Sequence, residues 1–98
     1  MAEVNWSRSA QRDLHAIHDR IAADSLLYAK RFIARIESAA DQLGAYPGKA
    51  HPVPDFGLKH IRQVNIGDYR LIYLDLPQGV YIARIYHSAR LLRIIHLK

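Results

Sequence analysis

Cysteine is absent from the 98 residues, so neither disulfide bonds nor thiolate metal ligands hold this fold together. No apolar run approaches the roughly 18 residues that a membrane span requires, so we expect no membrane partner. The first residues are charged and include no apolar stretch of a secretory signal, which favours the cytoplasm. Half of the residues are hydrophobic, which excludes a disordered chain and predicts one domain over residues 1–98.

Catalytic signatures are missing as well. The sequence has no Gly-rich phosphate loop, no nucleophile elbow and no paired-histidine zinc helix. His15 and His18 are three residues apart on an expected helix and therefore share a face. A zinc site needs three or four ligands, and no third ligand accompanies them. We therefore predict no metal and no cofactor.

Positive charge is concentrated in the second half of the chain. Residues 1–48 hold six basic and six acidic side chains, whereas residues 49–98 hold eight basic and three acidic ones. The whole formal charge of +5 therefore lies in the second half. This asymmetry favours an acidic or polyanionic partner, although a basic surface that only confers solubility fits equally well.

The first half of the chain predicts a short strand and two helices. The strand is expected at residues 4–7, and Ser7 or Ser9 is a suitable N-cap for the first helix. Its apolar stripe has helical spacing: Ala10, Leu14, Ile17 and Ile21. Asp24 or Ser25 caps the second helix, which we expect to end at Gly44 as a left-handed C′ residue. Its stripe is Ala29, Phe32, Ile33, Ile36, Ala40 and Leu43, and the short break predicts an antiparallel helical hairpin.

The second half predicts an ordered loop followed by three strands. Prolines and glycines crowd residues 46–60, which is typical of a loop. Strands are expected at about 61–66, 69–76 and 80–86, joined by a tight turn at Gly67-Asp68 and a looser one at Pro77-Gln78-Gly79. Residues 90–98 fit either a short helix or a further strand, because their periodicity does not decide between the two.

These elements predict an α+β fold in the order β-α-α-β-β-β. A short N-terminal strand leads into the helical hairpin, and a three-stranded antiparallel sheet packs on that hairpin. Alternation within the strands separates Arg62 from Ile61 and Gln63, and separates Arg70 from Tyr69 and Leu71.

Cationic side chains along these strands are the candidate site: Arg62, Arg70, Arg84, His87 and Arg90. Such side chains on neighbouring strands, flanked by tyrosines, are suited to bind phosphate or carboxylate groups. Each arginine fits equally well as a structural residue that bonds to backbone carbonyls or forms ion pairs.

The order of motifs over nearly the whole chain resembles the RelE/ParE superfamily of bacterial toxins. The matching segments are Trp6-Ser7, Ala10, Asp13-Leu14, Ile17, Leu43, Pro47, Ile61-Arg62, Tyr69-Arg70-Leu71-Ile72-Tyr73 and Ile85-Tyr86-His87-Ser88-Ala89-Arg90. The resemblance implies a toxin of a type II toxin–antitoxin system that causes growth arrest and helps maintain a plasmid or chromosome. It also implies a cognate antitoxin as partner and contact with operator DNA only through that antitoxin.

Two activities divide the superfamily. ParE-like members inhibit DNA gyrase without assigned nuclease chemistry, and the long hairpin and the His87–Arg90 ending are more similar to this branch. RelE-like members cleave mRNA on the ribosome, and the resemblance then implies catalytic roles for Asp55, Arg70 and His87. Lys49 and Lys59 are isolated, whereas efficient ribosome-dependent members have a lysine-rich loop. A nontoxic remnant or a DNA-binding module is a third alternative.

Antitoxin contact is expected at apolar residues near the C-terminus: Leu91, Leu92, Ile94 and Ile95. An amphipathic partner segment fits such a surface. The same residues are equally suited to close the core of the domain itself.

Overall fold

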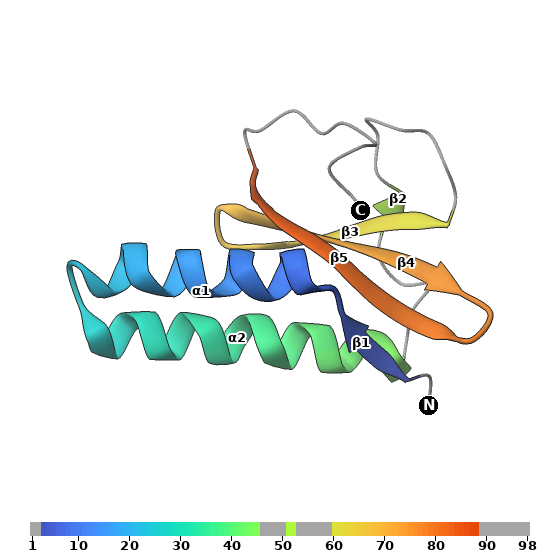
Figure 1. Ribbon diagram of the computed structural model, residues 1–98, viewed down its shortest axis with the longest axis horizontal. Helices are drawn as coiled ribbons and strands as arrows, with labels where there is room; N and C mark the ends of the chain where they lie inside the picture. The colour runs from blue at the N-terminus through green and yellow to red at the C-terminus, as the bar shows by residue number, and fades with distance from the viewer. Residues whose placement is uncertain (1–2, 46–50, 53–59, 89–98) are drawn as a thin grey trace.

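The computed structural model describes residues 3–45, 51–52 and 60–88. In chain order its elements are β1 (Val4–Trp6), α1 (Arg8–Ala22), α2 (Leu26–Ala45), β2 (His51–Pro52), β3 (Ile61–Ile66), β4 (Tyr69–Leu76) and β5 (Gly79–His87). The predicted α+β class and the predicted order of elements are confirmed (Figure 1). Residues 46–50, 53–59 and 89–98, which include Asp55, Arg90 and the expected antitoxin contacts, lie outside the described residues.

The sheet is mixed, with the strand order β1-β5-β4-β3-β2. β3, β4 and β5 form the predicted antiparallel meander, and β5 is one residue longer at each end than expected. β1 joins this sheet parallel to β5, so the sheet is not purely antiparallel. β2 pairs with β3 within the segment that we expected to be loop. Pro52 is tolerated there because β2 is an edge strand, where a missing N–H breaks no interior ladder.

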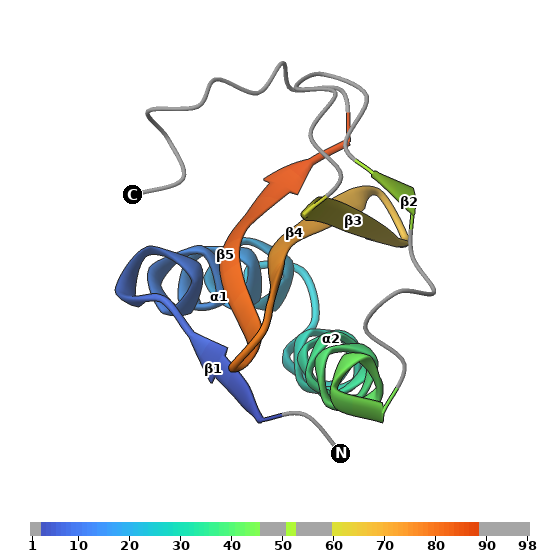
Figure 2. The ribbon, with the colours of Figure 1, turned by 90° about the vertical axis from the view of Figure 1, so that its right-hand side faces the viewer.

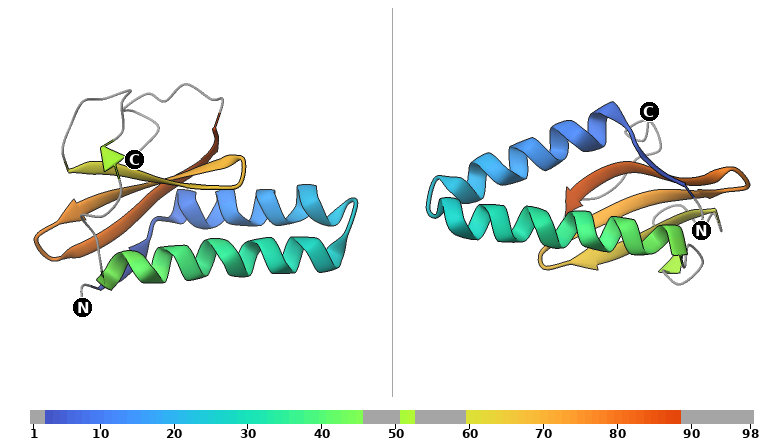
Figure 3. Two further views of the ribbon diagram at one scale, coloured as in Figure 1. Left: turned by 180° about the vertical axis from the view of Figure 1, so that it is seen from behind. Right: turned by 90° about the horizontal axis from the view of Figure 1, so that it is seen from below.

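α1 and α2 form the predicted antiparallel hairpin and cover one face of the sheet (Figures 1 and 2). Ser7 is the N-cap of α1, and its hydroxyl accepts the N–H of Ala10 at 2.8 Å. Ser25 plays the same part for α2 by accepting the N–H of Tyr28 at 3.1 Å. The turn between the helices projects beyond the sheet (Figures 1 and 3). None of the described helices is long and apolar enough to cross a membrane.

The expected end of the second helix at Gly44 is wrong. Gly44 is buried within α2, which continues to Ala45. Its backbone φ is not positive, so it does not serve as a left-handed C′ residue. A glycine near the end of an apolar stripe is also suited to close packing inside a helix. Gly44 has this packing role and not the role of a helix terminator.

Two other glycines do need their special conformations. Gly67 has φ +57° and opens the two-residue turn between β3 and β4, as the sequence predicts. The second turn is tighter than expected, because Leu76 pairs with Gly79 across Pro77 and Gln78. Gly79 has φ +147°, and a Cβ there would lie 2.6 Å from the carbonyl oxygen of Glu3. This close approach lets the N–H of Val80 donate to the same oxygen at 2.8 Å.

The main core lies between the hairpin and the sheet. It combines the predicted helical stripes with the strand residues that face them, including the fully buried Leu71, Tyr73 and Ile82. A smaller buried cluster on the opposite face consists of Ile61, Ile72 and Tyr86, with Leu74 packed against it. The two clusters take alternate residues of the same strands, as the pleat requires.

Candidate functional site: the cationic strands and the edge of β5

The register of the sheet sorts the predicted cations between the two faces. Arg62 is opposite Tyr73, and His87 is opposite Tyr69, so both lie on the side that the helices cover. Arg70 is opposite Tyr86, and both belong to the other face. Arg70 and His87, which the nuclease alternative joins in one reaction, therefore point to opposite sides of the sheet.

Arg84 is held by a carboxylate from α1. Its Nε donates to Asp13 Oδ2 at 2.7 Å and its Nη2 donates to Asp13 Oδ1 at 3.1 Å. This fork geometry is the strong, charge-assisted form of an arginine–carboxylate pair. The hydrogen bond to Asp13 is the main cause that raises the pKa of Arg84, and the negative charge of Asp13 adds to it against the desolvation of the guanidinium. The guanidinium also lies 4.6 Å from the ring centroid of Tyr86.

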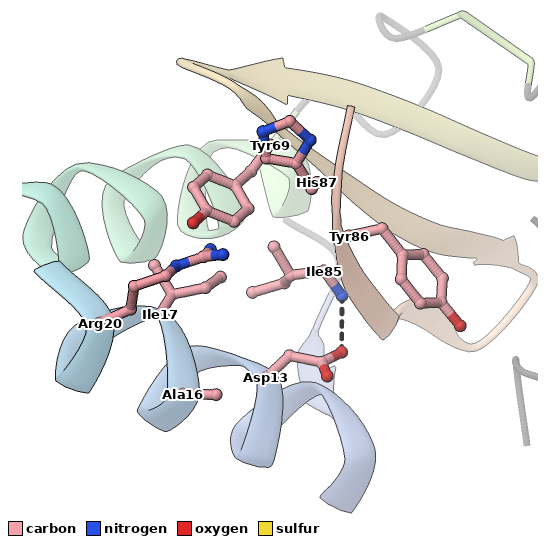
Figure 4. A pocket seen from close by; sticks show the side chains of 8 residues that line it. All are labelled: Asp13, Ala16, Ile17, Arg20, Tyr69, Ile85, Tyr86 and His87. Carbon is pink, nitrogen blue, oxygen red and sulfur yellow. Dashed lines mark hydrogen bonds between the residues drawn. The ribbon is translucent and has the colours of Figure 1, made fainter. Parts of the chain in front are cut away.

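The Asp13 carboxylate also accepts a hydrogen bond from the edge of β5, where β1 no longer pairs with it. β1 pairs with β5 only from Val80 to Ile82. Beyond that point the Ser7 hydroxyl donates to the carbonyl of Ala83 at 2.6 Å. The N–H of Ile85 donates to Asp13 Oδ2 at 2.9 Å (Figure 4). Two side chains from the start of α1 therefore replace the backbone partners that a longer β1 would have supplied.

The other two arginines make looser contacts. Arg62 Nε lies 3.6 Å from Asp75 Oδ2, an ion pair near the end of the meander. Arg70 is 9% exposed, and its Nη1 donates to Gln63 Oε1 at 3.4 Å. A buried cation needs hydrogen-bond partners, and Gln63 provides one of them for Arg70. Target contact or catalysis by Arg62, Arg70, Arg84, His87 and Arg90 stays a prediction.

His87 ends β5 beside an aromatic ring and an arginine that the sequence reasoning did not select. Its ring meets Tyr69 edge-on at 5.7 Å between centroids, and the guanidinium of Arg20 lies 5.2 Å from the centroid of Tyr69. These side chains, with Asp13, line a cavity of about 320 Å³ between α1 and the end of β5 (Figure 4). In Figure 4 Tyr86 points away from the other side chains toward the opposite face.

Asp13 and Arg20 were missed as site residues because helical periodicity assigned them to the outside of α1. The sequence contained a signal for Asp13, which lies three residues after Ala10 and four before Ile17 and so borders the buried stripe. A carboxylate at such a border is well placed to pair with a cation of the neighbouring sheet. Arg20 gave no comparable signal.

Metal ligands do not cluster in the described part of the chain. His15, His18 and Glu37 line one cavity between α1 and α2, yet no group of three His, Asp or Glu side chains within residues 3–45 and 60–88 is arranged to hold a metal ion. His18 instead lies 3.2 Å from the carboxylate of Asp19.

The described part of the chain is thus an α+β protein with a helical hairpin on one face of a mixed sheet and its first strand parallel to the last (Figure 2). The family model described as the ParE toxin of the type II toxin–antitoxin system parDE matches residues 4–92. The chain therefore belongs to the ParE toxin family and is a toxin of a type II toxin–antitoxin system.

The matched relatives include proteins named RelE as well as proteins named ParE. Toxin RelE2 of Caulobacter vibrioides is 37% identical over 91 residues, which cover 93% of this chain and all of that protein. Among solved structures, the chromosomal ParDE system from P. aeruginosa matches with a TM-score of 0.74 at 21% identity, over 89% of this chain and 96% of that one. The RelBE2 toxin–antitoxin complex of Mycobacterium tuberculosis matches with a TM-score of 0.62 at 27% identity, over 88% and 96%. The first of these structures supports the fold alone.

Proposed function

We propose that this toxin inhibits DNA gyrase in the cytoplasm and that a cognate antitoxin neutralises it. The observation that carries the proposal is the separation of Arg70 and His87 on opposite faces of the sheet. A phosphodiester cleaved by a ribonuclease needs its charge clamp and its proton-transfer group within hydrogen-bond reach of the same phosphate and ribose. The match of the ParE family model over residues 4–92 supports the same branch.

An antitoxin partner is supported by the family model and by one solved relative. The family model describes a toxin of a type II toxin–antitoxin system, and the RelBE2 structure, 27% identical, is named as a toxin–antitoxin complex. We infer that the antitoxin of this chain contacts Leu91, Leu92, Ile94 and Ile95, and that the toxin meets operator DNA only through its antitoxin. A shortened chain that ends at Arg90 tests this contact. If it stays folded and loses antitoxin binding, the docking role is supported; if it unfolds, these residues belong to the core.

The second candidate is a ribosome-dependent mRNA endonuclease. The 37% identity to a protein named Toxin RelE2 favours it. In this alternative, Asp55, Arg70 and His87 form the catalytic set, and replacing Arg70 or His87 by Ala abolishes toxicity while antitoxin binding persists. Because Arg70 is buried, its variant must first be shown to fold, for example by circular dichroism.

The two candidates are separated by two parallel assays of one purified toxin. We expect loss of gyrase supercoiling activity, which the antitoxin restores, and intact mRNA in a translating extract. Untouched supercoiling together with cleaved mRNA would establish the endonuclease instead. Absence of growth arrest on expression without the antitoxin would leave a nontoxic remnant or DNA-binding module.

A further inference from the structure

Four aromatic rings follow one another from the helical hairpin to the end of β5. Tyr28 stacks on Phe32 at 6.3 Å between centroids with 13° between the ring planes. Phe32 meets Tyr69 at 5.7 Å and 52°, and Tyr69 meets His87 at 5.7 Å and 80°. The two middle rings are buried, whereas Tyr28 and His87 at the ends are exposed. We call this set of four residues the aromatic row.

Two exposed arginines lie over the buried middle of the aromatic row. The guanidinium of Arg20, from α1, is 5.2 Å from the Tyr69 centroid, and that of Arg35, from α2, is 6.0 Å from the Phe32 centroid. A ring face below a guanidinium attracts it and limits the rotamers that it visits. Both cations are therefore held in place while they remain open to solvent, which lowers the entropy cost of binding an anion.

A cavity lies on each side of Tyr69. The first, of about 320 Å³, is lined by Arg20, His87 and Asp13. The second, of about 220 Å³, is lined by Tyr28, Phe32, Arg35 and Asp68 among others. Tyr69 belongs to both linings, so the two cavities are neighbours along the aromatic row, and we call the pair of them the groove.

Charge differs between the two ends of this groove. In the first cavity, Asp13 already accepts three hydrogen bonds, two from Arg84 and one from Ile85, so its charge is balanced. Arg20 then leaves that cavity positive at neutral pH. In the second cavity, Arg35 and Asp68 have opposite signs, and the lining between them is apolar. Leu26 and Leu27, the first two residues of α2, are also exposed, at 54% and 61%.

We propose that this groove binds an acidic segment of a partner protein. A carboxylate of that segment pairs with Arg20 in the first cavity, and an aliphatic or aromatic side chain packs against Tyr28 and the stem of Arg35 in the second. Arginine binds a carboxylate through two parallel hydrogen bonds, and exposed tyrosine beside aliphatic residues is a common anchor of protein interfaces. The proposal does not depend on whether the toxin acts on gyrase or on the ribosome.

A single-stranded nucleic acid fits the groove less well. Such ligands stack their bases on accessible aromatic faces. Phe32 and Tyr69 are only 7% and 9% exposed, and each has a guanidinium over its ring. Asp68 would also repel a phosphate in the second cavity. These observations favour a protein ligand.

The test starts from a library of random dodecapeptides displayed on phage and selected on the full-length toxin. Synthetic versions of the enriched peptides are then titrated by fluorescence anisotropy against the toxin and its Arg20→Gln, Arg35→Gln and Tyr28→Ala variants. Arg12→Gln and Arg31→Gln are matched controls, since both arginines are exposed on the same helices and do not line the groove.

We expect enriched peptides to carry Asp or Glu near an aliphatic or aromatic residue. Arg20→Gln should weaken their binding at least tenfold and Tyr28→Ala several-fold, while the two control variants bind as the unaltered toxin does. Three results would overturn the proposal: enrichment of neutral or basic peptides, equal losses in the control variants, or displacement of the peptides by a single-stranded oligonucleotide at lower concentration. Gyrase supercoiling is measured separately, so failure here leaves the proposed function untouched.

Discussion

The same three strands form both faces of the sheet, the one that α1 and α2 cover and the opposite one. The two faces differ in the size of the apolar cluster that they bury. The covered face contributes Leu71, Tyr73 and Ile82 to a large core shared with both helices. The opposite face buries only a small cluster and, next to it, the guanidinium-bearing Arg70. Strand alternation therefore lets one strand contribute apolar residues to both clusters and also place Arg70 on the opposite face.

The two faces are connected around the edge of β5. Asp13 comes from a helix on the covered face, and its partner Arg84 stands opposite Ile72 of the other face. A single carboxylate thus bonds the hairpin to the face that the helices do not reach. The comparison between the faces can be tested by changing each one and then the connection between them.

The largest difference is expected between two adjacent, fully buried residues of β4. Leu71→Ala removes a side chain from the main core and should lower the free energy of unfolding by about 3–5 kcal/mol. Ile72→Ala affects the smaller cluster, which has more room to relax, and should cost about 2–3 kcal/mol. Urea unfolding followed by circular dichroism measures both. An equal or larger cost for Ile72→Ala would show that the opposite face is as well packed as the covered one.

Removing the connection should have the next largest effect. Asp13→Ala leaves Arg84 and the N–H of Ile85 without their carboxylate, in a pair whose side chains are 21% and 16% exposed. We expect a loss of about 2–3 kcal/mol, below the value for a fully buried pair because water reaches part of it. Asp13→Asn should cost less, since its amide oxygen still accepts one hydrogen bond. Asp19→Asn on the same helix, where the side chain is 80% exposed, is the control and should stay within about 0.5 kcal/mol of the unaltered toxin.

The N-caps of the two helices should differ less in their contribution to the free energy of unfolding. Ser7 both caps α1 and donates to the buried carbonyl of Ala83, so Ser7→Ala should cost about 1–2 kcal/mol. Ser25 caps α2 at an exposed position, and Ser25→Ala should cost about 0.5–1 kcal/mol. Thermal unfolding of the two variants ranks them, and the reverse order would contradict the importance of the β5 edge.

The smallest expected quantity is the coupling between Arg70 and His87. Because their side chains lie on opposite faces, the effects of Arg70→Gln and His87→Gln on toxic potency should add on a logarithmic scale, within about 0.5 kcal/mol. Two catalytic groups that act on one phosphate give non-additive effects, since the second substitution reduces activity little once the first has been made. Potency is read from growth under titrated induction, and strong non-additivity would favour the endonuclease.

Much of this fold could be predicted from the sequence because its signals are local. The apolar stripes of α1 and α2, the turn at Gly67 and the bounds of β3 and β4 follow from periodicity and turn chemistry. The parallel pairing of β1 with β5 depends instead on residues more than 70 positions apart, which no local pattern encodes. The same holds for the pair between Asp13 and Arg84.

The candidate site could be predicted only in part. The cationic residues of the strands were identifiable by their chemistry, but their distribution between two faces depends on the register of β5 relative to β4. The aromatic row also combines two helical and two strand residues, which become neighbours only when the hairpin packs on the sheet.

The irregularity in β5 has an evolutionary consequence. Arg84 pairs with Ile72 and Ile82 pairs with Tyr73, so Ala83 is one residue more than the opposite strand requires. Before this bulge the even-numbered residues Val80 and Ile82 face the helices, and after it the odd-numbered Ile85 does. Because Arg84 already lies opposite Ile72 and Ile82 opposite Tyr73, loss of the codon for Ala83 would restore regular alternation while Arg84 and Ile85 keep their sides. A toxin lineage could thus gain or lose the bulge in one mutational step without exchanging the residues of the two faces, whereas a one-residue insertion or deletion in a regular part of the strand exchanges them.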